Sequence, residues 1–131
     1  MTHPVMKERP LSPHLSVYKP MLTMMMSIVH RITGAGLYFG MALFVWWLFA
    51  ASYSGDYFGQ VQWLVRSLGG KVVLFGFTWA LVHHALGGLR HLVWDTGRGF
   101  DLKFIEILAR ATIIGSILLT ILIWVVAYAM R

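Results

Sequence analysis

The stretch VVLFGFTWALVHHALGGL, residues 72–89, contains no Asp, Glu, Lys or Arg. It is 18 residues long, and a helix needs about 20 residues, at 1.5 Å each, to cross the roughly 30 Å hydrocarbon core of a bilayer. Two other windows also lack charged residues: 32–55, with 24 residues, and 111–130, with 20. The three windows predict transmembrane helices over about 22–52, 71–94 and 106–130.

The composition of the whole chain agrees with a membrane protein. Of its 131 residues, 58% are apolar and only 12% are charged, whereas soluble domains carry roughly 25% charged residues. A soluble chain this short would have to cover a large surface-to-volume ratio with polar side chains, so the composition excludes a soluble enzyme domain. The chain has no cysteine, which excludes disulfides and thiolate metal sites. We predict an all-α membrane protein, with residues 1–131 forming one transmembrane domain.

Basic residues predict the orientation of the helices. The side that holds the segment 1–21 and the loop before the third helix has eight basic residues, and the other side has three. The positive-inside rule then places the N-terminus in the cytoplasm. The eight are Lys7, Arg9, Lys19, Arg31, Arg90, Arg98, Lys103 and Arg110, and the three are Arg66, Lys71 and Arg131.

The same distribution bears on partners and location. The basic residues are spread along helix ends and form no reading face, so we expect membrane lipid and no nucleic acid as partner. The segment 1–21 contains prolines and charges where a secretory signal would have its apolar core. Because its prolines disfavour a helix, we expect an extended cytoplasmic segment. The segment also lacks the Arg-rich, amphipathic character of a transit peptide, so we expect a bacterial inner membrane rather than a mitochondrial one.

The middle helix carries histidines at membrane depth, where ionisable side chains usually have a function. His84 and His91 are seven residues apart, so they lie within about 20° of one another on a helix, with Gly88 between them. A zinc site is disfavoured, because no cysteine and no second histidine at i+3 or i+4 is present. Haem iron needs only one imidazole from each side and an apolar slot, which Gly87 and Gly88 could open.

Two interpretations of His84 follow from spacing alone: an axial haem ligand, or a structural histidine that bonds a neighbouring helix. His83 lies about 100° away on the helix and cannot face the same ligand. We expect it to pack or to form an interhelical hydrogen bond.

A second polar group lies at the start of the first helix. Haem propionates favour cations near the membrane surface, and His30 with Arg31 fits this need, as does Arg90 with His91 in the same leaflet. Ser27 lies one turn before Arg31, and the pair could hydrogen-bond a polar ligand with a lipophilic tail, such as a quinone. The alternative is an arginine that extends to the headgroups beside an incidental serine.

Three segments together resemble the cytochrome b membrane-anchor subunit of succinate dehydrogenase, respiratory complex II. They are RPLSPHL at 9–15, SxxHRxTG at 27–34, and HxxxGLRHLxxD at 84–95. The resemblance implies a bundle completed by a second anchor subunit, in a complex that also holds a flavoprotein and an iron–sulfur subunit. Electrons from succinate would pass through the iron–sulfur subunit to ubiquinone, linking the tricarboxylic acid cycle to the respiratory chain.

The resemblance also implies roles for single residues. His84 corresponds to one axial ligand of haem b, with the other supplied by the second anchor. His30, Arg31 and His91 correspond to neighbours of the haem propionates, and Ser27 with Arg31 to the quinone-binding pair. The chain alone would be non-catalytic.

Three other functions are compatible with parts of the pattern. The chain could anchor a fumarate reductase that works in the opposite direction, or it could be a haem-free structural anchor. A small multidrug-type transporter is disfavoured, because it would need an acidic residue inside a span. All five acidic residues lie outside the charge-free windows.

Overall fold

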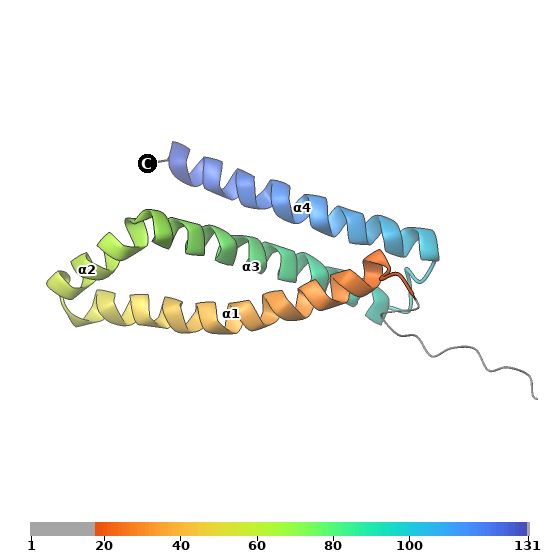
Figure 1. The fold of residues 1–131 in the computed structure, drawn as a ribbon, viewed down its shortest axis with the longest axis horizontal. Helices are drawn as coiled ribbons and strands as arrows, with labels where there is room; N and C mark the ends of the chain where they lie inside the picture. The colour runs from red at the N-terminus through yellow and green to blue at the C-terminus, as the bar shows by residue number, and fades with distance from the viewer. Residues whose placement is uncertain (1–17, 131) are drawn as a thin grey trace, which may run out of the picture.

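The structure is a computed structural model that describes residues 18–130, and in this part of the chain it is built from α-helices without strands (Figure 1). The helices are α1 (Leu22–Tyr53), α2 (Gly55–Arg66), α3 (Leu68–Asp95) and α4 (Leu102–Ala129). Of these, α1, α3 and α4 are long and apolar enough to cross a membrane. The predicted class, an all-α protein with three transmembrane helices, is confirmed, whereas α2 was not predicted.

Polar caps determine where three of the helices begin. The Ser54 side chain accepts a hydrogen bond from the Tyr57 amide at the start of α2, and Ser67 accepts one from the Gly70 amide at the start of α3. The Asp101 carboxylate accepts two from the first turn of α4. Such caps satisfy amides that have no partner inside the helix. Therefore α3 begins at 68 rather than 71, and α4 at 102 rather than 106.

The helix α2 connects the C-terminal end of α1 to the N-terminal end of α3. Aromatic side chains pack it against α1. The Trp46 indole nitrogen donates to the Tyr57 hydroxyl at 2.9 Å, and the rings of Trp47 and Phe58 meet edge to face. At the opposite end, the loop between α3 and α4 contains Gly97 and Gly99, both with positive φ. A side chain at either position would be strained.

Helix α3 lies between α1 and α4, and it contacts both (Figure 1). The core between the helices is small, and it is largely polar. Its buried apolar residues are Met26, Ala50, Val61 and Ala109, and its buried polar residues are Thr33, His83, Arg90, Thr112, Ser116 and Thr120. Most large apolar side chains are exposed, as expected of helices that face lipid or other chains.

Candidate functional site

The histidines of α3 lie on two distinct faces. His83, Gly87 and Arg90 are buried inside the bundle. His84 and Gly88 are half-buried, and His91 is exposed. The stripe that contains His84, Gly88 and His91 thus lies at the open edge of the bundle, where another chain or a ligand can reach it.

His83 forms the interhelical hydrogen bond expected of it. Its Nδ1 lies 3.1 Å from the Ser116 hydroxyl on α4. That hydroxyl also lies 2.9 Å from the Ile113 carbonyl in its own helix. The hydrogen bond between His83 and Ser116 fastens α3 to α4.

The tautomer of His84 is defined by a backbone carbonyl, which can only accept a hydrogen bond. Its Nδ1 lies 3.1 Å from the His30 carbonyl and 3.3 Å from the Thr33 hydroxyl. Thr33 already donates to that carbonyl, so both neighbours are acceptors and Nδ1 must be the donor. In the neutral ring, Nε2 then holds the lone pair. This is the arrangement in which histidine binds a metal: one nitrogen is fixed by an acceptor and the other is available.

The structure brings three of the predicted site residues together where α1 meets α3. The rings of His30 and His84 are stacked, with centroids 3.9 Å apart and planes 5° from parallel. The centroid of His91 lies 5.4 Å from that of His30. The three imidazoles form one group of nitrogen atoms toward the N-terminal end of α1.

Two glycines permit this close packing. A Cβ atom at Gly34 would lie 3.0 Å from Cε1 of His84, and one at Gly87 would lie 2.5 Å from Nδ1 of His30. Gly87 therefore allows α1 to pack closely against α3. It does not open a slot for a ligand, contrary to the sequence-based expectation. A Cβ atom at Gly88 would meet nothing within 4 Å, so Gly88 alone faces open space.

In the part of the chain that the structure describes, His30 and His84 could not both bind one metal ion from opposite sides. The lone pair of an imidazole nitrogen lies in the plane of its ring, so two rings stacked face to face cannot approach one ion from opposite sides. Among residues 18–130, no group of three or more His, Asp or Glu side chains is arranged to hold a metal ion. A closed metal site made by the described residues is thus excluded, whereas a haem shared with another chain fits.

The other predicted residues are distributed between the surface and the interior. Ser27 and Arg31 are exposed on α1, one helical turn apart. Arg90 is only 6% exposed, and its guanidinium lies 5.3 Å from the ring centroid of Trp94. Arg90 is therefore not the surface cation that the sequence suggested beside His91. The segment 9–15, Lys7 and Arg131 lie outside the described residues.

Thr33 and Ser116, which contact the two neighbouring histidines, were not predicted as site residues. The sequence did contain a signal for Ser116. Small polar residues recur every four positions in an otherwise apolar span, at Thr112, Ser116 and Thr120. Small polar residues at this spacing are typical of a helix interface in membranes. All three are buried.

Comparison with known proteins identifies the family. Residues 6–123 match the family described as succinate dehydrogenase/fumarate reductase transmembrane subunit. The succinate dehydrogenase cytochrome b556 subunit of Paracoccus denitrificans is 44% identical, over 92% of both chains. That of Rickettsia conorii is 37% identical, over 92% of this chain and 94% of the relative.

A mitochondrial relative is also similar. The cytochrome b560 subunit of Sus scrofa is 40% identical over 72% of this chain and 57% of its own length. The bacterial relatives and the three apolar helices indicate a multi-pass protein of the bacterial inner membrane. The match over most of its length shows that this chain belongs to the family of succinate dehydrogenase/fumarate reductase transmembrane subunits.

Proposed function

We propose that this chain is a succinate dehydrogenase anchor that binds haem b together with a second anchor subunit and helps to form the ubiquinone-reduction site. The observation that carries the proposal is the hydrogen bonding of His84. Its Nδ1 donates to acceptors on α1, so the Nε2 lone pair of His84 would be available to hold haem iron. The partner anchor would supply the other ligand, since the ring of His30 is stacked on His84 and would not reach the opposite side of the iron.

The residues around His84 suit the rest of a haem. Gly88 leaves space beside the ligand on the same face of α3. His30, Arg31 and His91 lie toward the cytoplasmic end of the bundle, and we assign them to the two propionates, since a cation or an N–H donor stabilises a carboxylate there. When bound, haem b supplies reversible one-electron chemistry within the membrane.

Ser27 and Arg31 form this chain's part of the quinone site. Both are exposed on one side of α1, one turn apart. The Ser27 hydroxyl donates a hydrogen bond to a quinone carbonyl, and the positive charge of Arg31 stabilises the oxygen that becomes negative during reduction. A guanidinium remains protonated, so the proton comes from water or a partner side chain.

The proposed haem and quinone sites require three partner subunits. A flavoprotein oxidises succinate, an iron–sulfur subunit carries the electrons, and the second anchor completes both sites. The family description covers both directions of catalysis, so an anchor for fumarate reduction is the alternative. The curated relatives given above are all named succinate dehydrogenase subunits, which favours succinate oxidation.

The test is to purify the complex from detergent-extracted membranes by a tag on this chain. Mass spectrometry should find the flavoprotein, the iron–sulfur subunit and a second small anchor. The visible spectrum of the reduced complex should show a b-type band. An assembled complex without a b-type band would make this chain a haem-free anchor, and the absence of the partners would contradict the proposed complex.

A further inference from the structure

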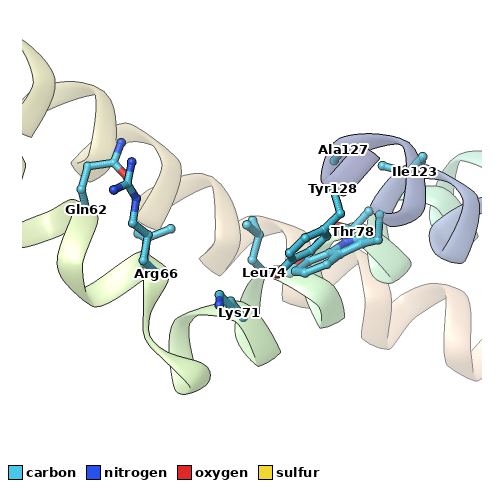
Figure 2. Close-up of a pocket in the computed structure, with 10 residues that line it drawn as sticks. Gln62, Arg66, Lys71, Leu74, Thr78, Ile123, Ala127 and Tyr128 are labelled. Atoms are coloured by element: carbon cyan, nitrogen blue, oxygen red, sulfur yellow. Dashed lines mark hydrogen bonds between the residues drawn. The ribbon is translucent and has the colours of Figure 1, made fainter. Parts of the chain in front are cut away.

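A cleft of about 380 Å³ lies at the other end of the bundle, where α2 joins α3 and α4 ends. Its two basic residues lie far from the histidine group, since Lys71 and His84 are 13 residues apart on α3, or about 20 Å; the nearest α3 residue of the cleft, Thr78, is about 9 Å from His84 along the helix. Figure 2 shows Gln62 and Arg66 on the α2 side of the cleft and Ile123, Ala127 and Tyr128 on the α4 side, with Lys71 and Leu74 between them.

The polar rim of this cleft carries positive charge. Arg66 is in the last turn of α2 and Lys71 is in the first turn of α3, and no acidic side chain lines the cleft. Within residues 18–130, the only ion pair joins Glu106 and Arg110 on α4. The two cations at the cleft are therefore available to an anionic group from outside the chain.

The remainder of the cleft is apolar and aromatic. Leu74 and Ile123 contribute aliphatic surface, and Trp124 lies between α3 and α4. The Trp124 indole nitrogen donates to the Thr78 hydroxyl at 3.3 Å, and its ring meets Phe75 edge to face. Trp and Tyr are typical of the membrane–water boundary, where their apolar and polar parts are both accommodated. The cleft thus combines an aliphatic wall with cations at headgroup depth.

We propose that this cleft binds one anionic phospholipid. The headgroup phosphate lies between Arg66 and Lys71, and an acyl chain runs along Leu74 and Ile123 beside the Trp124 ring. The occupant is an intact lipid, because a free phosphate would use the two cations and leave the apolar wall empty. With the N-terminus in the cytoplasm, the lipid belongs to the outer leaflet. The inference goes beyond the proposed haem and quinone sites and does not depend on them.

The test measures lipid binding by native mass spectrometry of the delipidated complex in detergent. The probes are phosphatidylglycerol, phosphatidylcholine with matched acyl chains, and inorganic phosphate. The Arg66→Gln/Lys71→Gln variant should bind phosphatidylglycerol about 25-fold more weakly, since each basic residue near an anionic surface contributes roughly fivefold. The matched control is Arg98→Gln/Lys103→Gln, which removes two exposed cations at the opposite end of the bundle.

A steric variant keeps the test valid if the double charge variant does not assemble. Ala127→Trp places a large ring in the cleft and leaves both cations, so it should also lose the lipid while the control variant retains it. Equal binding of phosphatidylcholine, or competition by inorganic phosphate at equal concentration, would overturn the proposal. Undiminished phosphatidylglycerol binding in Ala127→Trp would also overturn it.

Discussion

The adjacent residues His83 and His84 on α3 have different surroundings because they differ by about 100° in direction. His83 points into the bundle and bonds Ser116, whereas His84 bonds the α1 backbone. The sequence could predict this division from helical geometry, since only His84 shares a face with Gly88 and His91. It could not predict the hydrogen-bond partners of the two rings, because the His30 carbonyl and the Ser116 hydroxyl are distant from them in sequence.

Gly88→Leu tests whether the face of His84 accommodates a ligand. A Cβ at Gly88 meets nothing within 4 Å, so we expect the variant to fold and assemble but to lose most of the b-type absorbance. Gly76→Leu is the matched control, because it also has open space and lies about 120° away on the same helix. If both variants retained full absorbance per mole of this chain, the slot would lie elsewhere.

Ser27 and Arg31 should affect quinone reduction to different extents. Ser27→Ala removes one neutral hydrogen bond, so quinone reductase activity should fall about two- to twelvefold. Arg31→Leu removes a charge that acts on the developing negative oxygen, so the loss should be about a hundredfold or more. The measurement is succinate–quinone reductase activity on membranes at matched enzyme content.

A soluble electron acceptor provides the control for this pair. Succinate oxidation with that acceptor should be unchanged in both variants, because it requires only the flavoprotein. Equal losses with both acceptors would mean that the substitutions disrupt assembly. Unchanged quinone activity in Arg31→Leu would remove this chain from the quinone site.

At the scale of elements, charge-free windows predicted how many helices cross the membrane and where α1 begins, but not where α3 and α4 begin. The starts of α3 and α4 are determined by Ser67 and Asp101, and these caps lie outside the apolar windows. The short helix α2 was missed because its 12 residues are too few and too polar to span a bilayer. Its signal was Ser54 followed by Asp56 in the first turn, a common helix start.

The α3–α4 interface depends in part on the bond between His83 and Ser116. Ser116→Ala leaves His83 Nδ1 without its hydrogen-bond partner, so the free energy of unfolding should fall by about 0.6 kcal/mol and by no more than about 1.7 kcal/mol. Ser52→Ala is the control, since Ser52 is exposed and bonds only the backbone of its own helix. Thermal unfolding of the purified complex measures both. A smaller loss for Ser116→Ala than for Ser52→Ala would contradict the role of this bond.

At the scale of the whole molecule, composition predicted a membrane protein, and the charge-free windows predicted its three spanning helices. Neither could predict that α3 would lie between α1 and α4, because all three helices carry many large apolar side chains. The order depends instead on a few buried polar and small residues, such as Gly87 against His30. These contacts join segments far apart in sequence and have no local signature.

Because the chain has no cysteine, its orientation can be tested with introduced ones. In Gly59→Cys the new thiol lies on α2, and in Arg98→Cys it lies in the loop before α4; both positions are exposed. The positive-inside rule predicts that an impermeant thiol reagent added to intact cells labels Gly59→Cys and not Arg98→Cys. Both should react after the membrane is opened. The reverse pattern would place the N-terminus outside.

The most direct test of the haem assignment is the b-type absorbance of two variants, His84→Ala and His83→Ala, each normalised to the amount of this chain in the purified complex. His84 supplies the available Nε2 lone pair, whereas His83 only fastens α3 to α4. We expect His84→Ala to lose the b-type band or to show it strongly weakened and shifted. His83→Ala should retain the band with a small loss of thermal stability. Loss of the band in His83→Ala, with a normal band in His84→Ala, would contradict the account.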